Sequence, residues 1–185
     1  MDGMMVRGKV RLRYWWLGVG LGLLWMHWPA AAQPEAIQRL KNTGECVKCN
    51  LAGADLRGVN LIRANLSGAN LQGARLGTED RELNRTALSR ANLSNANLQG
   101  ADLRNVSLDG ANLSGANLSG ANLTGASFVG ANLAGANLQG ANLTGAVLVN
   151  TNLSNANFTG AVVQRAFIAE VVYQSTRWVD GSVRN

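Results

Sequence analysis

Two cysteines three residues apart are the first side chains in this sequence whose types and spacing suggest chemistry. Cys46 and Cys49 form a C-x-x-C motif, which occurs in redox-active pairs, in zinc sites and in disulfides. A zinc site needs about four ligands, and after residue 32 the chain has no other cysteine and no histidine. A thioredoxin-like motif needs a βαβ context, which the flanking sequence does not provide. The elements that hold the pair must therefore decide its role.

A second candidate is the most strongly charged stretch of the chain, which extends from Thr78 to Arg90. Charged side chains on a loop of a rigid scaffold often bind a partner, although an arginine-rich surface is more often simply solvated. If this surface binds a partner, the residues that we expect to contact it are Arg63, Glu79, Asp80, Arg81, Arg85 and Arg90.

Catalytic and metal sites are not expected in this chain. After residue 32 there is no histidine, and the Ser, Asp and Glu residues are scattered along the sequence. Such scattering does not suggest a triad or a pair of catalytic carboxylates. The phosphate-binding pattern G-x-x-x-x-G-K-[ST] does not occur. We therefore expect no enzyme and no cofactor.

The first 32 residues differ in composition from the rest. Residues 1–13 carry four basic residues and one acid, and an apolar run follows over 15–28. Ala30 and Ala32 then supply the small residues of an A-x-A cleavage site. The apolar run is shorter than the roughly 20 residues that span a bilayer, so we predict a cleaved signal peptide over residues 1–32. The alternative is a leader retained as an anchor.

Much of the basic charge comes from this leader. The whole chain has 17 Lys and Arg against 11 Asp and Glu, a formal net charge of +6. Without residues 1–32, 13 basic and 10 acidic residues remain, and the net charge falls to +3. Few aromatic residues are interleaved with the arginines, which weakens any case for nucleic-acid binding. We expect no nucleic-acid partner and no stable membrane insertion after signal cleavage.

The remainder of the chain repeats with a period of five. All twenty leucines from Leu51 onward are separated by multiples of five, apart from one seven-residue step between Leu76 and Leu83. The residue two places before each leucine is nearly always small, most often Ala. Neither a helix nor a strand puts residues five apart on one side. A chain that bends once per unit does, and stacked coils of this kind form a solenoid.

The unit A-(N/D)-L-x-x, present as ANLSG at 111–115, resembles the pentapeptide-repeat family from Gly44 to Glu170. The resemblance implies an all-β solenoid, namely a right-handed quadrilateral β-helix with four pentapeptides per coil and about six coils. We expect an N-terminal capping helix over 33–44, the β-helix over 45–170 and a C-terminal cap over 171–185.

The seven-residue step predicts a two-residue insertion near residues 78–80, after which Leu83 resumes the pattern. If each coil holds 20 residues, Asp55 stacks under Arg75. With the insertion allowed for, Arg63 stacks under Arg85.

In the repeat register Cys46 takes the leucine position and Cys49 the small inward position, so both side chains point into the first coil. We therefore expect a disulfide that closes this coil, because an exported protein meets oxidising conditions. Similar cysteine pairs occur just before the first repeats of exported cyanobacterial relatives. The leader and the pair together resemble proteins of the periplasm or thylakoid lumen.

These features predict an exported, non-enzymatic scaffold or protein-interaction module with an unidentified protein partner. We expect a monomer, or a dimer that pairs end to end through the C-terminal cap as some relatives do. The alternative is a DNA-mimicking inhibitor or protector of a topoisomerase (gyrase), a role that other family members have. That role needs an acidic rod, so the basic charge and the signal peptide disfavour it.

Overall fold

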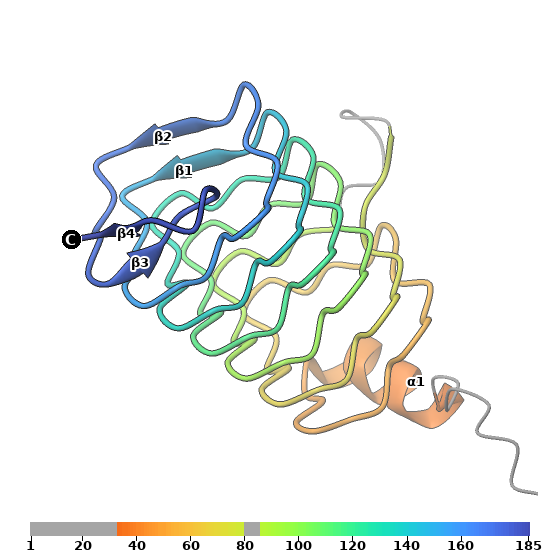
Figure 1. Cartoon of the computed structure of the whole chain (residues 1–185). Helices are drawn as coiled ribbons and strands as arrows, with labels where there is room; N and C mark the ends of the chain where they lie inside the picture. The colour runs from red at the N-terminus through yellow and green to blue at the C-terminus, as the bar shows by residue number, and fades with distance from the viewer. Residues whose placement is uncertain (1–32, 80–85) are drawn as a thin grey trace, which may run out of the picture.

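The computed structural model describes residues 33–79 and 86–185, so the predicted signal peptide lies outside the described residues. After one helix, α1 (Pro34–Thr43), the chain winds into stacked coils (Figure 1). None of the helices in the described part of the chain is long and apolar enough to cross a membrane. The strands are β1 (Val147–Val149), β2 (Phe167–Ala169), β3 (Thr176–Arg177) and β4 (Val183–Arg184).

Parallel β-bridges between residues 20 apart define the coil. Asn112, for example, bridges Asn132, and backbone hydrogen bonds tie the two coils together on both sides of the bridge. Leu113 donates its N–H to the Asn132 carbonyl at 2.7 Å, and Asn132 donates to the Ala111 carbonyl at 2.9 Å. β1 and β2 pair in parallel in the same register. With bridges at every fifth residue, a coil holds four pentapeptides, as the family resemblance implies.

A residue with positive φ turns the chain at almost every corner. Gly115 has a φ of 67°, and the next residue, Ala116, donates its N–H to the Leu113 carbonyl at 3.0 Å. This is a β-turn whose third residue is left-handed, a conformation that glycine adopts without steric cost. Asn95 takes the same place in its unit with a φ of 56°, because Asn also tolerates this region.

The interior is filled by the leucine and the small residue of each unit. Every leucine of the repeat that the structure describes is at most 1% exposed, and Phe128 and Phe158 replace leucine at 0%. Burying one such side chain contributes about 1.5–3 kcal/mol. A few threonines take the small position, and their hydroxyls are satisfied. That of Thr151, for example, donates to the Phe128 carbonyl at 2.9 Å. The stack therefore rests on apolar contacts between neighbouring coils.

Each end of the stack is covered. α1 buries Ala36 and Leu40 and ends at Gly44, which has a φ of 72° and donates its N–H to the Leu40 carbonyl. At the other end Trp178 is only 6% exposed, and its ring lies 5.2 Å from that of Phe158. β3 and β4, which precede and follow Trp178 in the sequence, pair antiparallel.

The boundary predicted at residue 170 is corrected by the structure. The parallel bridges continue as far as Asn157 with Arg177, so the coil extends past residue 170 and the cap begins near Trp178. Backbone bridges do not require a leucine in each unit, which is why the coil continues after the repeat has faded.

The predicted two-residue insertion is wrong, because seven residues are inserted. Asn60 bridges Ala87, a separation of 27 residues where other coils have 20. The chain leaves the coil after Thr78, whose N–H donates to the Arg104 carbonyl at 3.1 Å. It rejoins the coil at Thr86, which is buried. Leucines that recur every five residues show the position within a unit but not how many units lie in the coil. A seven-residue step between leucines therefore fits an insertion of two residues or of seven equally well.

Gly77 holds the chain close to the next coil, just before the insertion. A Cβ atom at this position would collide with the backbone nitrogen of Arg104 and lie 2.8 Å from its carbonyl oxygen. We expect Gly77→Ala to lower the free energy of unfolding by about 1–3 kcal/mol, measured by urea denaturation. Gly120→Asn is the control, because Gly120 has open space around it and should change stability by less than about 0.5 kcal/mol. Equal effects of the two substitutions would contradict the close approach.

Candidate interaction surface

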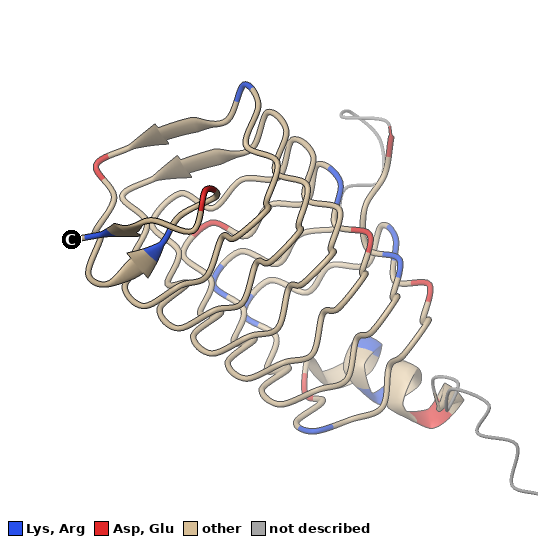
Figure 2. Cartoon of the chain, in the orientation of Figure 1, with Lys and Arg blue, Asp and Glu red and all other residues tan. Residues whose placement is uncertain are grey.

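Much of the outer surface is neutral and hydrogen-bonds to itself. Asn side chains stack from coil to coil, as where Asn97 Nδ2 donates to Asn70 Oδ1 at 3.2 Å. Between Asp109 and Arg165 the sequence contains no charged residue. In Figure 2 the corresponding stretch of the chain is tan, with neither blue nor red. Candidates for binding a charged partner therefore come from the remaining surface.

The charged column is a stack of side chains on one side of the first coils: Asp55, Arg57, Arg75, Glu79, Asp102 and Arg104. Asp55 bridges Arg75, which confirms the predicted stacking, and Arg75 in turn bridges Asp102. The charges in this stack alternate in sign from coil to coil. The guanidinium of Arg57 lies 2.6 Å from the Asp55 carboxylate, and that of Arg104 lies 2.8 Å from both Asp102 and Glu79. The column therefore satisfies its own charges.

These ion pairs lower the pKa values of two carboxyl groups in the column, Asp55 and Asp102. Hydrogen bonds from the Arg57 side chain lower the pKa of Asp55 from 3.8 to about 2. Hydrogen bonds from Arg104 likewise lower the pKa of Asp102. Both carboxylates are stabilised in their charged form because each accepts hydrogen bonds from a cation.

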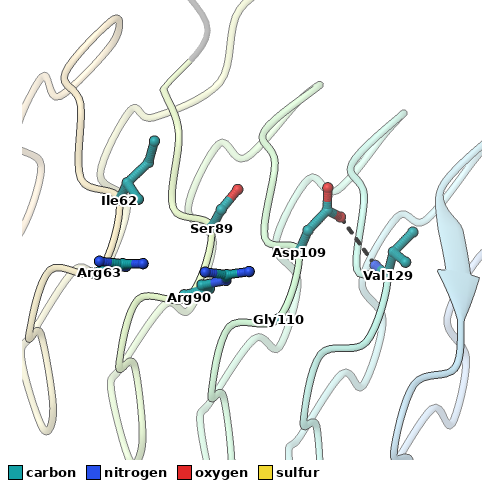
Figure 3. A pocket seen from close by; sticks show the side chains of 7 residues that line it. All are labelled: Ile62, Arg63, Ser89, Arg90, Asp109, Gly110 and Val129. Carbon is teal, nitrogen blue, oxygen red and sulfur yellow. Dashed lines mark hydrogen bonds between the residues drawn. The ribbon is translucent and has the colours of Figure 1, made fainter.

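The arginine groove is a shallow groove along a neighbouring corner (Figure 3), lined by Ile62, Arg63, Ser89, Arg90, Asp109, Gly110 and Val129. Arg63 donates its N–H to the Ser89 carbonyl at 3.0 Å, which places it beside Arg90 on the adjacent coil. Both arginines occupy the left-handed corner position, each with a φ of 60°. Among the described residues, neither guanidinium has a hydrogen bond or an ion pair. Within residues 33–79 and 86–185, the groove therefore presents two cations side by side without an ion-pair partner.

Asp109 is the acid of this groove, but its carboxylate is already bonded. It accepts hydrogen bonds from the Ser127 hydroxyl, from the Val129 N–H at 3.1 Å and from the Ser107 hydroxyl at 3.2 Å. Figure 3 shows its side chain turned toward Val129. Asp109 therefore braces the next coil and, among the described residues, forms no ion pair with either arginine.

The cysteine pair lies at the base of the stack. Cys46 and Cys49 are 0% and 6% exposed, their Cα atoms are 5.3 Å apart, and their sulfurs are joined in the structure. The Arg39 guanidinium, from α1, lies 2.6 Å from Cys49 Sγ. The disulfide thus lies within the first coil, and the Arg39 contact joins the capping helix to it.

The structure brings together only some of the residues predicted to bind a partner. Arg63 and Arg90 share the groove, and the predicted stacking of Arg63 under Arg85 is wrong because the inserted residues number seven. Glu79 lies in the charged column instead. Asp80, Arg81 and Arg85 lie outside the described residues. The sequence pattern alone did not point to the role of Asp109. Its only signal was its place at the start of the uncharged stretch.

The charged column makes stability depend on pH. Because the pKa of Asp55 is lowered in the folded protein, its contribution is present above about pH 4 and is lost as the pH falls from 3.8 toward 2. Asp55→Asn should lower the midpoint of thermal unfolding by about 1–3 °C at pH 6 and by clearly less at pH 2. Circular dichroism melts measure both values. A deficit of equal size at the two pH values would contradict an electrostatic role, and about 1 M salt should shrink the deficit at pH 6.

Comparison with known proteins identifies the family to which the repeat belongs. A comparison with curated proteins finds no match. Among solved structures, HetL, a pentapeptide repeat protein involved in heterocyst differentiation regulation from the cyanobacterium Nostoc sp. strain PCC 7120, is 33% identical. The match covers 76% of this chain and 66% of HetL, with a TM-score of 0.46. QnrB1, a plasmid-mediated fluoroquinolone resistance protein, is 28% identical over 66% of this chain and 59% of its own, with a TM-score of 0.38.

A third solved structure is a pentapeptide repeat protein from the Arabidopsis thaliana thylakoid lumen. It is 29% identical over 64% of this chain and 68% of its own, with a TM-score of 0.28. The family described as pentapeptide repeats matches eight copies within residues 45–77, 86–125 and 126–165. These ranges cover more than half of the chain and leave out the inserted segment. The chain therefore belongs to the pentapeptide-repeat family.

Proposed function

We propose that this chain is an exported, non-enzymatic scaffold or protein-interaction module, built as the right-handed quadrilateral β-helix of about six coils that its family implies. One observation carries the proposal: leucine, alanine and phenylalanine fill the interior, while the charged column and the arginine groove lie outside. Small-molecule sites are usually concave and enclose most of their ligand. A filled rod with chemistry on its outer sides favours contact with a protein surface instead.

Export is supported by the sequence of residues 1–32 and by the cysteine pair. A basic start, a short apolar run and small residues at the exit are typical of a secretory leader. The two cysteines face each other inside the first coil, and such a pair forms a lasting disulfide only in an oxidising compartment. We propose the periplasm or the thylakoid lumen as that compartment.

A topoisomerase-directed role is a weaker proposal for this chain. A DNA mimic needs a continuous acidic stripe, whereas the charged column alternates Asp55, Arg75 and Asp102, and the arginine groove is basic. A gyrase supercoiling assay distinguishes the two functions. Inhibition or protection at stoichiometric protein would support the topoisomerase role over the scaffold.

The scaffold function is tested by crosslinking in the native compartment followed by mass spectrometry. We expect one reproducible protein partner, with crosslinks from side chains on the outer faces of the first coils. As a control, the experiment is repeated with a lysine-reactive crosslinker that is quenched before the cells are disrupted. If crosslinks are absent or spread evenly over many unrelated proteins, the proposal fails.

The disulfide gives a separate prediction. Protein recovered from the export compartment should show no free thiol before reduction and two after it. Because the closed loop is short, reduction should lower the free energy of unfolding by about 2 kcal/mol, measured by urea denaturation. The double variant Cys46→Ala with Cys49→Ala is the control and should not respond to the reductant. Two free thiols in the unreduced protein would contradict both the disulfide and the oxidising compartment.

A further inference from the structure

The arginine groove differs from the charged column in how it arranges like charges. In the column each arginine has an acid on the next coil or in its own unit. In the groove Arg63 lies beside Arg90 with no acid bonded to either among the described residues. Neighbouring coils are about 4.8 Å apart, and like charges placed directly opposite each other in a sheet destabilise it. The groove therefore holds a local repulsion that an anion would relieve.

The backbone adds a second unfavourable feature at the same two residues. Arg63 and Arg90 both have a φ of 60°, a region that disfavours residues with a Cβ atom. The next two coils have Gly110 and Gly130 at this corner, with φ values of 66° and 67°. Glycine thus serves the turn itself. Other corners, such as Arg165, also hold a non-glycine residue in this conformation, so the conformation fixes where the two side chains start and the pairing of like charges sets this corner apart.

The surroundings of the arginines leave their guanidinium groups open to a ligand. Gly110 carries no side chain, and a Cβ there would lie 3.4 Å from Arg90 Cγ, so the Arg90 side chain runs across this glycine. Asp109 is bonded to the next coil and does not close the groove. Two exposed apolar side chains, Ile62 at 50% and Val129 at 39%, stand at its two ends (Figure 3).

We propose that the arginine groove binds an extended acidic segment of the protein partner, with a carboxylate held between Arg63 and Arg90. Guanidinium groups bind carboxylates through paired hydrogen bonds, and Ile62 and Val129 supply apolar contacts for flanking side chains. The groove is open along the stack and has apolar ends, which suits a peptide better than a small inorganic ion. This inference rests on the proposed scaffold function and names the chemistry of the partner.

The test is fluorescence anisotropy with a fluorescein-labelled hexapeptide of alternating Glu and Val, and a second peptide with Gln in place of Glu. At low salt, we expect the Glu peptide to bind the full chain at least about tenfold more tightly than the Gln peptide. Arg63→Asn with Arg90→Asn should weaken binding of the Glu peptide about tenfold or more. Asn preserves the corner, because Asn95 already adopts the same backbone conformation.

The matched control is Arg165→Asn. Arg165 is also a left-handed corner arginine, with a φ of 57°, but it lies outside the groove, so its loss should change binding less than about twofold. Equal binding by the double variant and the wild type overturns the proposal, as does equal binding of the two peptides. Inorganic phosphate that competes more strongly than the Glu peptide would also overturn it, because the groove would then be a site for small anions.

Two further readouts separate the possible failures. The melting temperature of the double variant should equal or exceed that of the wild type, and a clear decrease would show that the arginines are structural. The second readout is crosslinking in the native compartment. If the double variant crosslinks to the partner as well as the wild type does, this inference is overturned and the scaffold function is unaffected. A wild type that crosslinks no partner overturns the scaffold function instead.

Discussion

The narrow interior of the coil is the constraint on which the rest of the structure depends. Each side of the coil admits one large side chain and one small one, so the pair Leu113 and Ala111 recurs with little variation. Because the interior accepts nothing polar without a partner, the buried hydroxyl of Thr151 must bond a carbonyl. The remaining three residues of each unit are forced outward, where they form the corner and the face. Stability is therefore built from one repeated contact between neighbours, and the surface can vary without disturbing it.

The outward Asn residues show how the surface is made inert. In a typical unit the Asn112 side chain accepts the N–H of Ser114 at 3.1 Å, which braces the corner. Its Oδ1 atom also accepts from Asn132 Nδ2 on the next coil at 3.4 Å. Such stacked amides satisfy one another as they do in other stacked β-structures. Where the Asn is replaced, by Asp55, Arg75 or Ser107, the surface acquires new chemistry, so the departures from the repeat locate the candidate sites.

The sequence was sufficient for the parts of the fold that the repeat dictates. The period of five and the small residue before each leucine predicted the coil, and the register placed Cys46 and Cys49 inside it. The length of the insertion was not predictable from the period, which fixes only the phase. A finer signal was present: Arg81 stands two places before Leu83, where a small residue belongs. That mismatch is a departure from the repeat in the sequence itself, and it agrees with a coil that is seven residues longer than its neighbours.

Arg63 lies beside Arg90 because the insertion is seven residues long, and the sequence did not predict this length. The sequence therefore indicated both residues as candidates but not that they are neighbours. The regular coils on either side make the pairing tolerable. In a solenoid each coil contacts only its neighbours, so an unfavourable corner weakens the stack locally while the apolar interior beneath it is unchanged. Leu61 and Leu88, next to the two corners, are at most 1% exposed and hold the backbone in place. The arginines are thus held side by side before any ligand arrives, and a carboxylate that binds them need not order the groove first.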